Sequence, residues 1–185
     1  MLKNDLFSAL SDMEIMSQVF NIEPFEIYLL GGSGCVLAGY IQRATRDFDI
    51  IDLEYKSQLG RVLKLLEPYD MIDIQLAVIP ESYKKRAIRL DNFKYLHIFV
   101  LSREDIIISK LGRYNERDAD DIKIMLPDSD INVILNLSDE VLNNSDLYVK
   151  IKKAFIKNFI SMTKECDIDV QNYVQQLEKL CRILQ

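Results

Sequence analysis

The chain has 185 residues, of which 49% are hydrophobic and 28% are charged, so its composition is that of an ordinary globular protein. This length suits one domain, or a core with a helical appendage, and is enough to bury a substantial interior. The formal net charge of −6 argues against broad, non-specific binding of DNA or RNA, although it leaves room for a local basic patch.

The N-terminal segment has the periodicity of an amphipathic helix. Over the first twenty positions the apolar residues recur near the 3.6-residue helical period, at Leu6, Leu10, Met13 and Phe20. We expect this helix to end within residues 21–24. The apolar and aromatic run Phe25–Leu30 then stops at paired glycines, which predicts a buried strand entering a tight turn.

The glycine turn after this strand is suited to an anion. Gly31 and Gly32 let the backbone approach a ligand closely, and they lead into a helix predicted over Ser33–Tyr40. The free N–H groups at the start of a helix, with the positive end of its dipole, favour negative charge. We therefore expect a phosphate group to bind here.

Two carboxylates open the next predicted strand. Strand side chains alternate between faces, so Asp47 and Asp49 point the same way while Phe48 points into the packing. Carboxylates this close repel each other unless a cation lies between them or water solvates both. Hard oxygen ligands favour Mg²⁺ or Mn²⁺. The turn and the carboxylates together predict a site for a metal-bound nucleoside triphosphate, whereas a solvated strand rim is the alternative.

These residues resemble the signature of a known superfamily. Leu30-Gly31-Gly32, followed by Arg43-x-Thr45-x-Asp47-Phe48-Asp49, resembles the motif of nucleotidyltransferases with a DNA polymerase beta-like fold, and is similar to small bacterial members near the AbiEii-type toxins. A second block, from Ser102-Arg-Glu-Asp105 through Lys110 to Arg117-Asp118-x-x-Asp121, resembles the segment that follows the catalytic sheet in those proteins.

The resemblance implies both a fold and a reaction. The fold is α/β (α+β), a mixed sheet backed by helices, with a helical C-terminal region. The reaction moves a nucleoside monophosphate from a nucleoside triphosphate to an acceptor. Gly31, Gly32 and Ser33 would hold the distal phosphates. The likeness to toxins also raises a role in a toxin–antitoxin pair.

A third carboxylate follows in the next predicted strand, Met71–Ile79, after a helix predicted to run from Ser57 to about Glu67. Asp73 is the one acidic residue of that strand, and burying an unpaired charge is costly. In the superfamily a carboxylate on a neighbouring strand completes the metal site and can act as the base, so the resemblance points to Asp73. Asp52 is a weaker candidate because its odd spacing from Asp47 places it on the opposite strand face.

The segment Pro80–Asn92 is polar and basic, with Lys84, Lys85, Arg86 and Arg89. We expect an exposed loop or short helix there, which would contact phosphates if the acceptor is a nucleic acid. The next strand is predicted over Phe93–Leu101 and contains His97, which is interpreted as a packing residue.

Ser102 and Asp105 have the spacing of a capping box at the start of a helix. Lys110 lies on the apolar, inward side of that helix, where it either extends to solvent or, as its family-like position implies, binds the triphosphate. We expect Arg117, Asp118 and Asp121 to form a salt-bridge network.

Residues 127–185 are predicted as a helical region packed on a nucleotidyltransferase-like core of residues 1–126. A joint is expected over residues 127–138. The helices that follow carry apolar stripes, and Asp169 is predicted to cap the last of them.

Three cysteines, Cys35, Cys166 and Cys181, lie far apart, and His97 is the single histidine, so neither a zinc site nor a disulfide framework is expected. The N-terminus lacks the order of a signal peptide, and the most apolar region, residues 27–41, is too short to span a bilayer. We expect no membrane association and a reduced cytoplasmic setting.

Together these observations predict a Mg²⁺- or Mn²⁺-dependent nucleotidyltransferase that uses Asp47, Asp49 and Asp73, with Lys110 and the glycine turn binding the nucleotide. The acceptor, whether tRNA, protein or small molecule, stays open. Two alternatives also stay open. One is a dinucleotide-binding turn built on Gly32-x-Gly34, with Asp52 and Glu54 closing the next strand. The other is a catalytically silent relative that binds an antitoxin-like partner.

Overall fold

The computed structural model describes residues 1–74 and 77–184, and within them the chain forms a mixed five-stranded sheet. The strands are β1 (Glu26–Leu30), β2 (Phe48–Ile51), β3 (Tyr69–Ile72), β4 (Ile88–Arg89) and β5 (His97–Val100), in the order β3-β2-β1-β5-β4. The pairs β1–β2 and β4–β5 are antiparallel, whereas β1–β5 and β2–β3 are parallel. This mixed sheet with its helices confirms the predicted α/β class.

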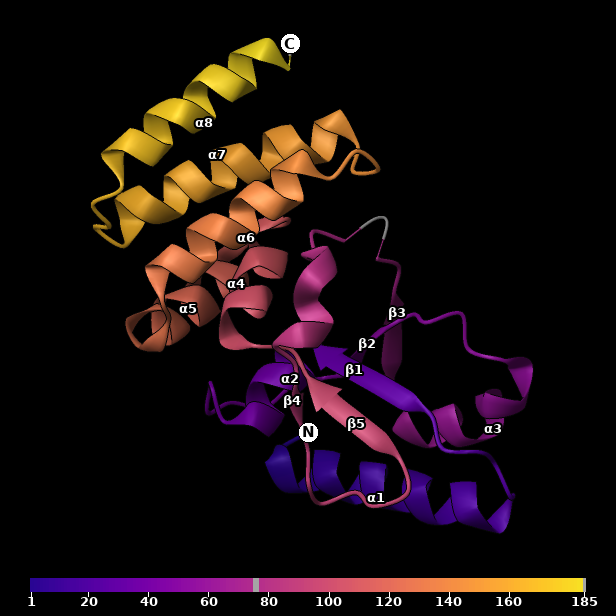
Figure 1. The fold of residues 1–185 in the computed structure, drawn as a ribbon. Helices are drawn as coiled ribbons and strands as arrows, with labels where there is room; N and C mark the ends of the chain where they lie inside the picture. The colour runs from indigo at the N-terminus through magenta and orange to yellow at the C-terminus, as the bar shows by residue number, and fades with distance from the viewer. Residues whose placement is uncertain (75–76, 185) are drawn as a thin grey trace.

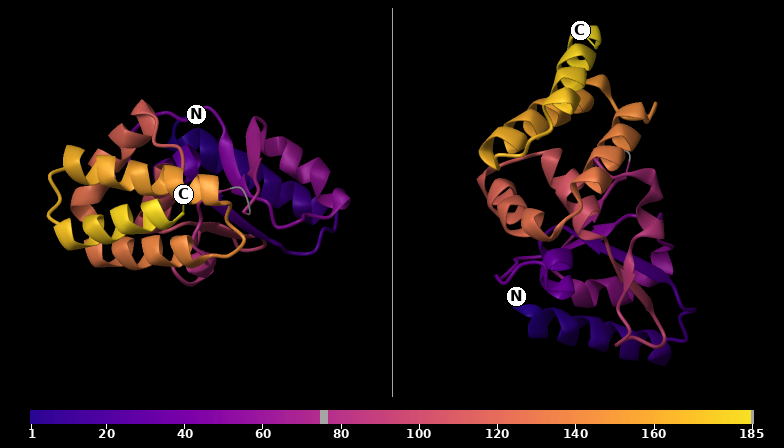
Figure 2. Two further views of the ribbon diagram at one scale, coloured as in Figure 1. Left: turned by 90° about the horizontal axis from the view of Figure 1, so that it is seen from above. Right: turned by 60° about the vertical axis from the view of Figure 1, so that its left-hand side comes forward.

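The helices divide into two groups along the chain. The first group is α1 (Lys3–Val19), α2 (Gly31–Ala38) and α3 (Gly60–Leu63), which lie with the sheet in the lower part of Figure 1. The second group is α4 (Arg103–Leu111), α5 (Glu116–Met125), α6 (Ile131–Asn143), α7 (Val149–Glu165) and α8 (Gln171–Ile183). These helices form the upper part, and α7 and α8 lie farthest from α1 (Figures 1 and 2).

The two faces of the sheet are covered differently. Leu29, Ile50 and Ile98 are fully buried on the face that carries α2. The helix packs so closely there that a Cβ on Gly34 would lie 3.1 Å from the Leu29 carbonyl oxygen. On the other face Tyr28 stacks on Phe99, with ring centroids 4.9 Å apart. This alternation follows from the two-residue period of a strand.

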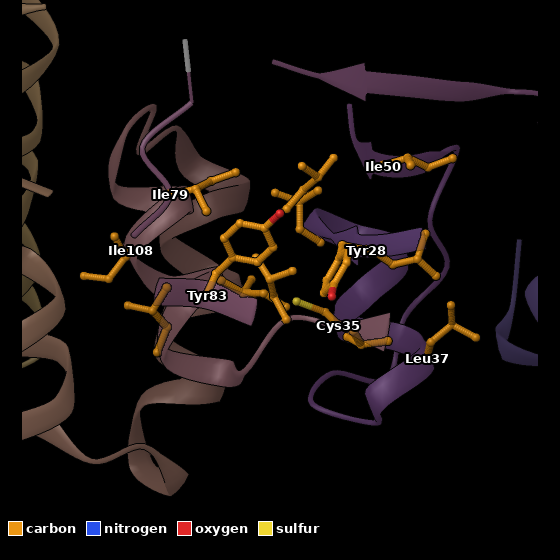
Figure 3. Close-up of a cluster of buried hydrophobic side chains, with 14 of the residues drawn as sticks. Tyr28, Cys35, Leu37, Ile50, Ile79, Tyr83 and Ile108 are labelled. Carbon is orange, nitrogen blue, oxygen red and sulfur yellow. The ribbon is translucent and has the colours of Figure 1, made fainter. Parts of the chain in front are cut away.

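An aromatic contact joins the sheet to the chain that follows it. The ring of Tyr83, from the 3₁₀ helix η3 (Glu81–Lys85), meets Tyr28 edge-on at 5.3 Å between centroids. Figure 3 shows that Ile79, Tyr83 and Ile108 gather on one side of this cluster, opposite side chains of the sheet and α2. Burial of these apolar surfaces therefore holds the two groups of helices on one core.

The turn from β1 into α2 is tighter than predicted. The helix begins at Gly31 rather than at Ser33, and it ends at Ala38, before Gly39 in the left-handed conformation with φ +75°. Gly31 is itself left-handed, with φ +57°, which a residue with a side chain rarely adopts. The glycines are therefore part of the helix start, and no loop separates the strand from the helix.

The predicted third strand, Met71–Ile79, is wrong in its second half. β3 covers Tyr69–Ile72, so Asp73 lies directly after the strand, and residues 75–76 of the prediction fall outside the described residues. Val78 and Ile79 are buried, and Val78 lies against Gly112, where a Cβ would come within 2.8 Å of it. The apolar pattern correctly indicated burial, but the burial is against α4 and its end rather than within the sheet.

Two other predicted elements are shorter than expected. The helix predicted over residues 57–67 is divided into the 3₁₀ helix η1 (Ser57–Leu59), α3 and the 3₁₀ helix η2 (Lys64–Leu66). The strand predicted over residues 93–101 is reduced to β5. The segment of residues 80–92 forms η3, as a short helix was expected, and adds β4 at the sheet edge.

The C-terminal helices pack on α4 and on one another. The joint predicted over residues 127–138 is wrong beyond Asp130, since Asp130 caps α6 by accepting the Asn132 N–H at 2.9 Å. α6 and α7 both contact α4, and α8 contacts α7. The last helix begins after Val170, without the predicted side-chain cap from Asp169.

Candidate nucleotide and metal site

A hydrogen bond joins the glycine turn to Asp49, the carboxylate of β2. Asp49 Oδ2 accepts the Gly32 N–H at 2.9 Å. A Cβ on Gly31 would lie 2.0 Å from the same carboxylate oxygen, so only glycine fits at this position. At Gly32 a Cβ would lie 2.6 Å from Thr45 Oγ1. The two glycines therefore let the turn approach Asp49 and the Arg43–Asp47 segment closely.

Ser33 has a structural role in this unit. Its side chain is fully buried, its hydroxyl donates to the Leu30 carbonyl at 3.2 Å, and it accepts the Asp49 N–H at 3.0 Å. The hydroxyl thus joins the end of β1 to the start of β2. These two bonds already engage the hydroxyl. The predicted contact of Ser33 with phosphate stays a prediction.

Asp47 and Asp49 share one electrostatic environment. Asp47 directly precedes β2, and both residues are partly exposed. Burial raises the pKa of the Asp49 carboxyl, the Gly32 N–H opposes that rise, and the negative charge of Asp47 raises the pKa further. The site therefore favours a proton or a cation beside Asp49.

Asp49 lies in the wall of a pocket of about 400 Å³. The polar part of the wall also includes Gly31, Asp73, Ser109, Lys110 and Arg113. Most of the rest of the wall is apolar, from Leu30, Met71, Ile72, Ala77, Val78 and Ile151. A mostly apolar cleft with a few convergent polar groups is the usual form of a small-molecule site.

Asp73 is exposed and shares the pocket with Asp49, but it is not level with Asp49 in the sheet. The Cα partner of Asp49 in the parallel β2–β3 ladder is Asp70. Asp73 lies three residues further along the chain, which corresponds to about 10 Å of extended strand. Within the described residues, no group of three histidine, cysteine or acidic side chains is arranged to hold a metal ion.

Lys110 lies at the centre of a buried charge network. Its side chain is only 4% exposed, and Nζ lies 3.1 Å from Asp118 Oδ1 and 2.7 Å from Asp121 Oδ2. The Arg43 guanidinium donates to both oxygens of Asp121, at 2.9 and 2.7 Å. Asp118 also accepts from Arg113 Nε and Nη2, each at 3.2 Å. Three cations thus surround two carboxylates beside the pocket.

The expected network is confirmed for Asp118 and Asp121 and wrong for Arg117, whose Nη2 donates to the Ala44 carbonyl instead. Burial alone would raise the pKa of Asp121, but hydrogen bonds from Arg43 and Lys110 outweigh it and lower that pKa. Asp121 is therefore ionised near neutral pH, in contact with Arg43 and Lys110.

Arg113 is the pocket cation that the sequence reasoning missed. Its side chain is 70% exposed, although its guanidinium contacts Asp118. The bond to Asp118 raises the pKa of Arg113, and the charges of Asp49 and Asp47 add to that effect. The available signal was its place three residues after Lys110, directly behind Gly112.

The basic segment after Pro80 is partly engaged inside the protein. Arg86 donates to both oxygens of Asp105, at 3.0 and 2.7 Å, and to Ser82 Oγ at 2.8 Å. Ser102 caps α4 as predicted, since its Oγ accepts the Asp105 N–H at 3.1 Å. The Asp105 carboxylate accepts from Arg86 and from the Ser102 hydroxyl, so its main role is a buried ion pair.

Comparison with known proteins agrees with this geometry. A family model described as "Nucleotidyltransferase of unknown function (DUF6036)" matches residues 4–155, so the chain belongs to this nucleotidyltransferase family. Searches of the curated proteins and of the solved structures gave no significant match. In the described part of the chain, no helix is both long and apolar enough to cross a bilayer.

The donors present fit the divalent metal that such a family implies. Mg²⁺ is commonly held by one or two carboxylates, with water and substrate phosphates completing its six ligands. Asp47 and Asp49 supply that number of carboxylates, and the raised pKa of Asp49 shows that its ionised form gains from a nearby cation. A third protein ligand is not required for such a site.

Proposed function

We propose that the protein is a metal-dependent nucleotidyltransferase that moves a nucleoside monophosphate from a nucleoside triphosphate to an acceptor hydroxyl and releases pyrophosphate. The observation that carries this proposal is the bond from the Gly32 N–H to Asp49, which brings a glycine turn and a carboxylate together in one pocket. Family membership supports the same class of reaction.

Each residue has a distinct role in the proposal. Asp47 and Asp49 would hold Mg²⁺ or Mn²⁺, which would neutralise phosphate charge and lower the pKa of the acceptor hydroxyl. The glycine turn and Arg113 would position the triphosphate. Asp73, on the same pocket wall, would accept the acceptor proton. Lys110 would act mainly by fixing the network that orients Arg113, because two carboxylates already bind its ammonium group.

The test is transfer of label. The full chain is incubated with each labelled nucleoside triphosphate, Mg²⁺ and a cell extract, and the labelled molecular class is then identified. We expect label on one class of acceptor, lost in chelator and in Asp49→Asn. Asp52→Asn is the matched control, since Asp52 lies after β2 and accepts the Glu54 N–H at 2.8 Å. Full transfer by Asp49→Asn would refute the proposed site.

A second candidate is a catalytically silent relative that binds an antitoxin-like partner in the cytoplasm. The observation in its favour is that the Ser33 hydroxyl, predicted to bind phosphate, is buried and already bonded to Leu30 and Asp49. It predicts that a small protein encoded beside this one co-purifies with it. It also predicts that Mg²⁺ and triphosphates leave the melting temperature unchanged, whereas a metal-dependent nucleotidyltransferase should melt at a higher temperature when they bind.

A further inference from the structure

The proposed function leaves the basic face of α7 without a role. This helix carries Lys150, Lys152, Lys153, Lys157 and Lys164 but only one acidic residue, Glu165. The chain as a whole has a net charge of −6. Positive charge is therefore concentrated on one helix of an acidic protein, which is the pattern of a local site for an anion.

The lysines form a stripe on the outer side of the helix. Lys150, Lys153 and Lys157 are three and four residues apart, so they lie on adjacent turns of one face. Lys164 continues that stripe, about 21 Å from Lys150 at the helical rise. The opposite face packs inward through Phe155, Phe159 and Met162. The stripe is long enough to follow an extended polyanion rather than a single phosphate.

The lysines of α7 have no ion-pair partner among the described residues. Arg43, Arg86 and Lys110 all belong to ion pairs, whereas none of the ion pairs found among residues 1–74 and 77–184 involves a lysine of α7. Like charges three and four residues apart weaken a helix. A stripe of like charges that costs stability and forms no ion pair with the described residues is suited to a partner of opposite charge.

The stripe begins beside the nucleotide pocket. Ile151, between Lys150 and Lys152, lines the same pocket as Asp49. Asn158 Nδ2 donates to the Leu111 carbonyl at 2.8 Å, which fixes α7 on the end of the helix that carries Lys110. Tyr148, 65% exposed, directly precedes α7 and offers a ring on which a base can stack.

We propose that Tyr148 and the lysine stripe of α7 bind the phosphodiester backbone of a nucleic-acid strand, so that the acceptor in the transfer reaction is a nucleic acid. This inference rests on the proposed function, because the transfer site defines which side of the pocket receives the acceptor. It also moves the expected acceptor contacts away from the segment after Pro80, where Arg86 is engaged with Asp105.

The test compares two triple variants of the full chain that lose the same charge. Lys150→Gln/Lys153→Gln/Lys157→Gln removes three of the four lysines of the stripe, and Lys56→Gln/Lys64→Gln/Lys94→Gln removes three exposed lysines of the sheet layer. The probes are a labelled single-stranded RNA of about 20 nucleotides and DNA of the same sequence, both longer than one typical strand-binding site. Fluorescence anisotropy over a salt series gives the affinity and its salt dependence.

We expect the stripe variant to bind at least about tenfold more weakly, with a log–log salt slope smaller by about 2, because three phosphate contacts are lost. The control should bind as the parent does. Tyr148→Ala should weaken binding about tenfold, and Tyr148→Phe should restore it. A preference for RNA or DNA then identifies the strand type, since the backbone chemistry is shared.

Two outcomes would overturn the inference: equal weakening in both triple variants, or no binding of either strand by the parent at low salt, whether or not it binds phosphatidylserine vesicles. A separate measurement, transfer by Asp49→Asn, tests the proposed function. Asp49→Asn should bind the strand as the parent does while losing transfer, so retained transfer in Asp49→Asn counts against the metal site alone.

Discussion

The carboxylates on the two sides of the pocket differ in their ion-pair partners. On the α4–α5 side, called the closed wall, Lys110 and Arg113 line the pocket and pair with Asp118 and Asp121 behind them. These two carboxylates are buried, and each contacts two cations. On the β1–β2 side, called the open wall, no ion pair within the described residues involves Asp47 or Asp49. The hydrogen bond that Asp49 accepts there comes from a backbone N–H. Since buried charges are normally paired, the charges of Asp118 and Asp121 are balanced within the protein, whereas Asp47 and Asp49 are the carboxylates to which the proposed function assigns the metal.

The largest effect that this comparison predicts is the loss of Lys110. Lys110→Met would remove the ammonium group that contacts both buried carboxylates, and breaking a buried ion pair typically costs about 3–5 kcal/mol of stability. Urea denaturation measures it. Lys123→Met is the control, because Lys123 pairs with Glu165 on the surface at 3.5 Å and such pairs contribute about 1 kcal/mol or less.

An unchanged stability in Lys110→Met, together with weaker triphosphate binding, would contradict this role. It would support the direct nucleotide contact that the sequence predicted for Lys110. Transfer rates cannot separate the two roles, so stability and binding must both be measured.

The next effect concerns the open wall. Asp47→Asn and Asp49→Asn should each lower the transfer rate by more than about 100-fold, because changes even outside the direct ligands of a metal typically cost about 10–100-fold. Both variants should fold as the parent does. Single-turnover transfer at saturating Mg²⁺ measures the loss, and a loss that excess Mn²⁺ partly restores would identify the effect as metal binding.

A smaller effect is expected for Arg113, which lines the pocket and contacts Asp118. Arg113→Gln should weaken triphosphate binding about tenfold, since one charge-assisted contact is worth about 1.5–3 kcal/mol. Its stability should change little, because the side chain is largely exposed. Titration calorimetry with Mg²⁺ and triphosphate measures the affinity, with Arg117→Gln as the control. Equal affinity in both variants would exclude Arg113 from the site.

The sequence predicted the open wall better than the closed one, for a physical reason. The strand, the glycine turn and the paired carboxylates are local features within about thirty residues, and their periodicity and turn chemistry can be read directly. The fold class follows from the order of such elements.

The closed wall depends on partners that are distant in sequence. Arg43 meets Asp121 across 78 positions, and Arg86 meets Asp105 across 19. A local pattern also does not indicate which carboxylate a cation will meet. Arg113 was missed although its partner Asp118 lies only five residues away, and Arg117 was assigned wrongly to the network. The burial of Val78 and Ile79 was predicted, but not the helix that buries them, and Asp73 was therefore placed within a strand that ends before it.

The smallest predicted effect is a change in stability that has opposite signs on the two walls. In chelator at pH 7, Asp49→Asn should be more stable than the parent by about 1 kcal/mol or less, because it removes an ionised carboxylate that the folded protein disfavours. Asp121→Asn should instead be less stable.

The pH dependence follows from the direction of each pKa shift. The folded-state pKa of Asp49 is raised, so its contribution to stability is complete below the unfolded value of about 3.9 and is lost as pH rises through the folded value. The advantage of Asp49→Asn should therefore shrink as pH falls from 7 towards 4. The pKa of Asp121 is lowered, so its contribution is present above about 3.9 and is lost only as pH falls through a still lower value. The deficit of Asp121→Asn should persist at pH 4. Urea denaturation of the three proteins at pH 4 and 7 in chelator measures both differences, and equal stability of Asp49→Asn and the parent at both pH values would show that the open wall is an ordinary solvated strand rim.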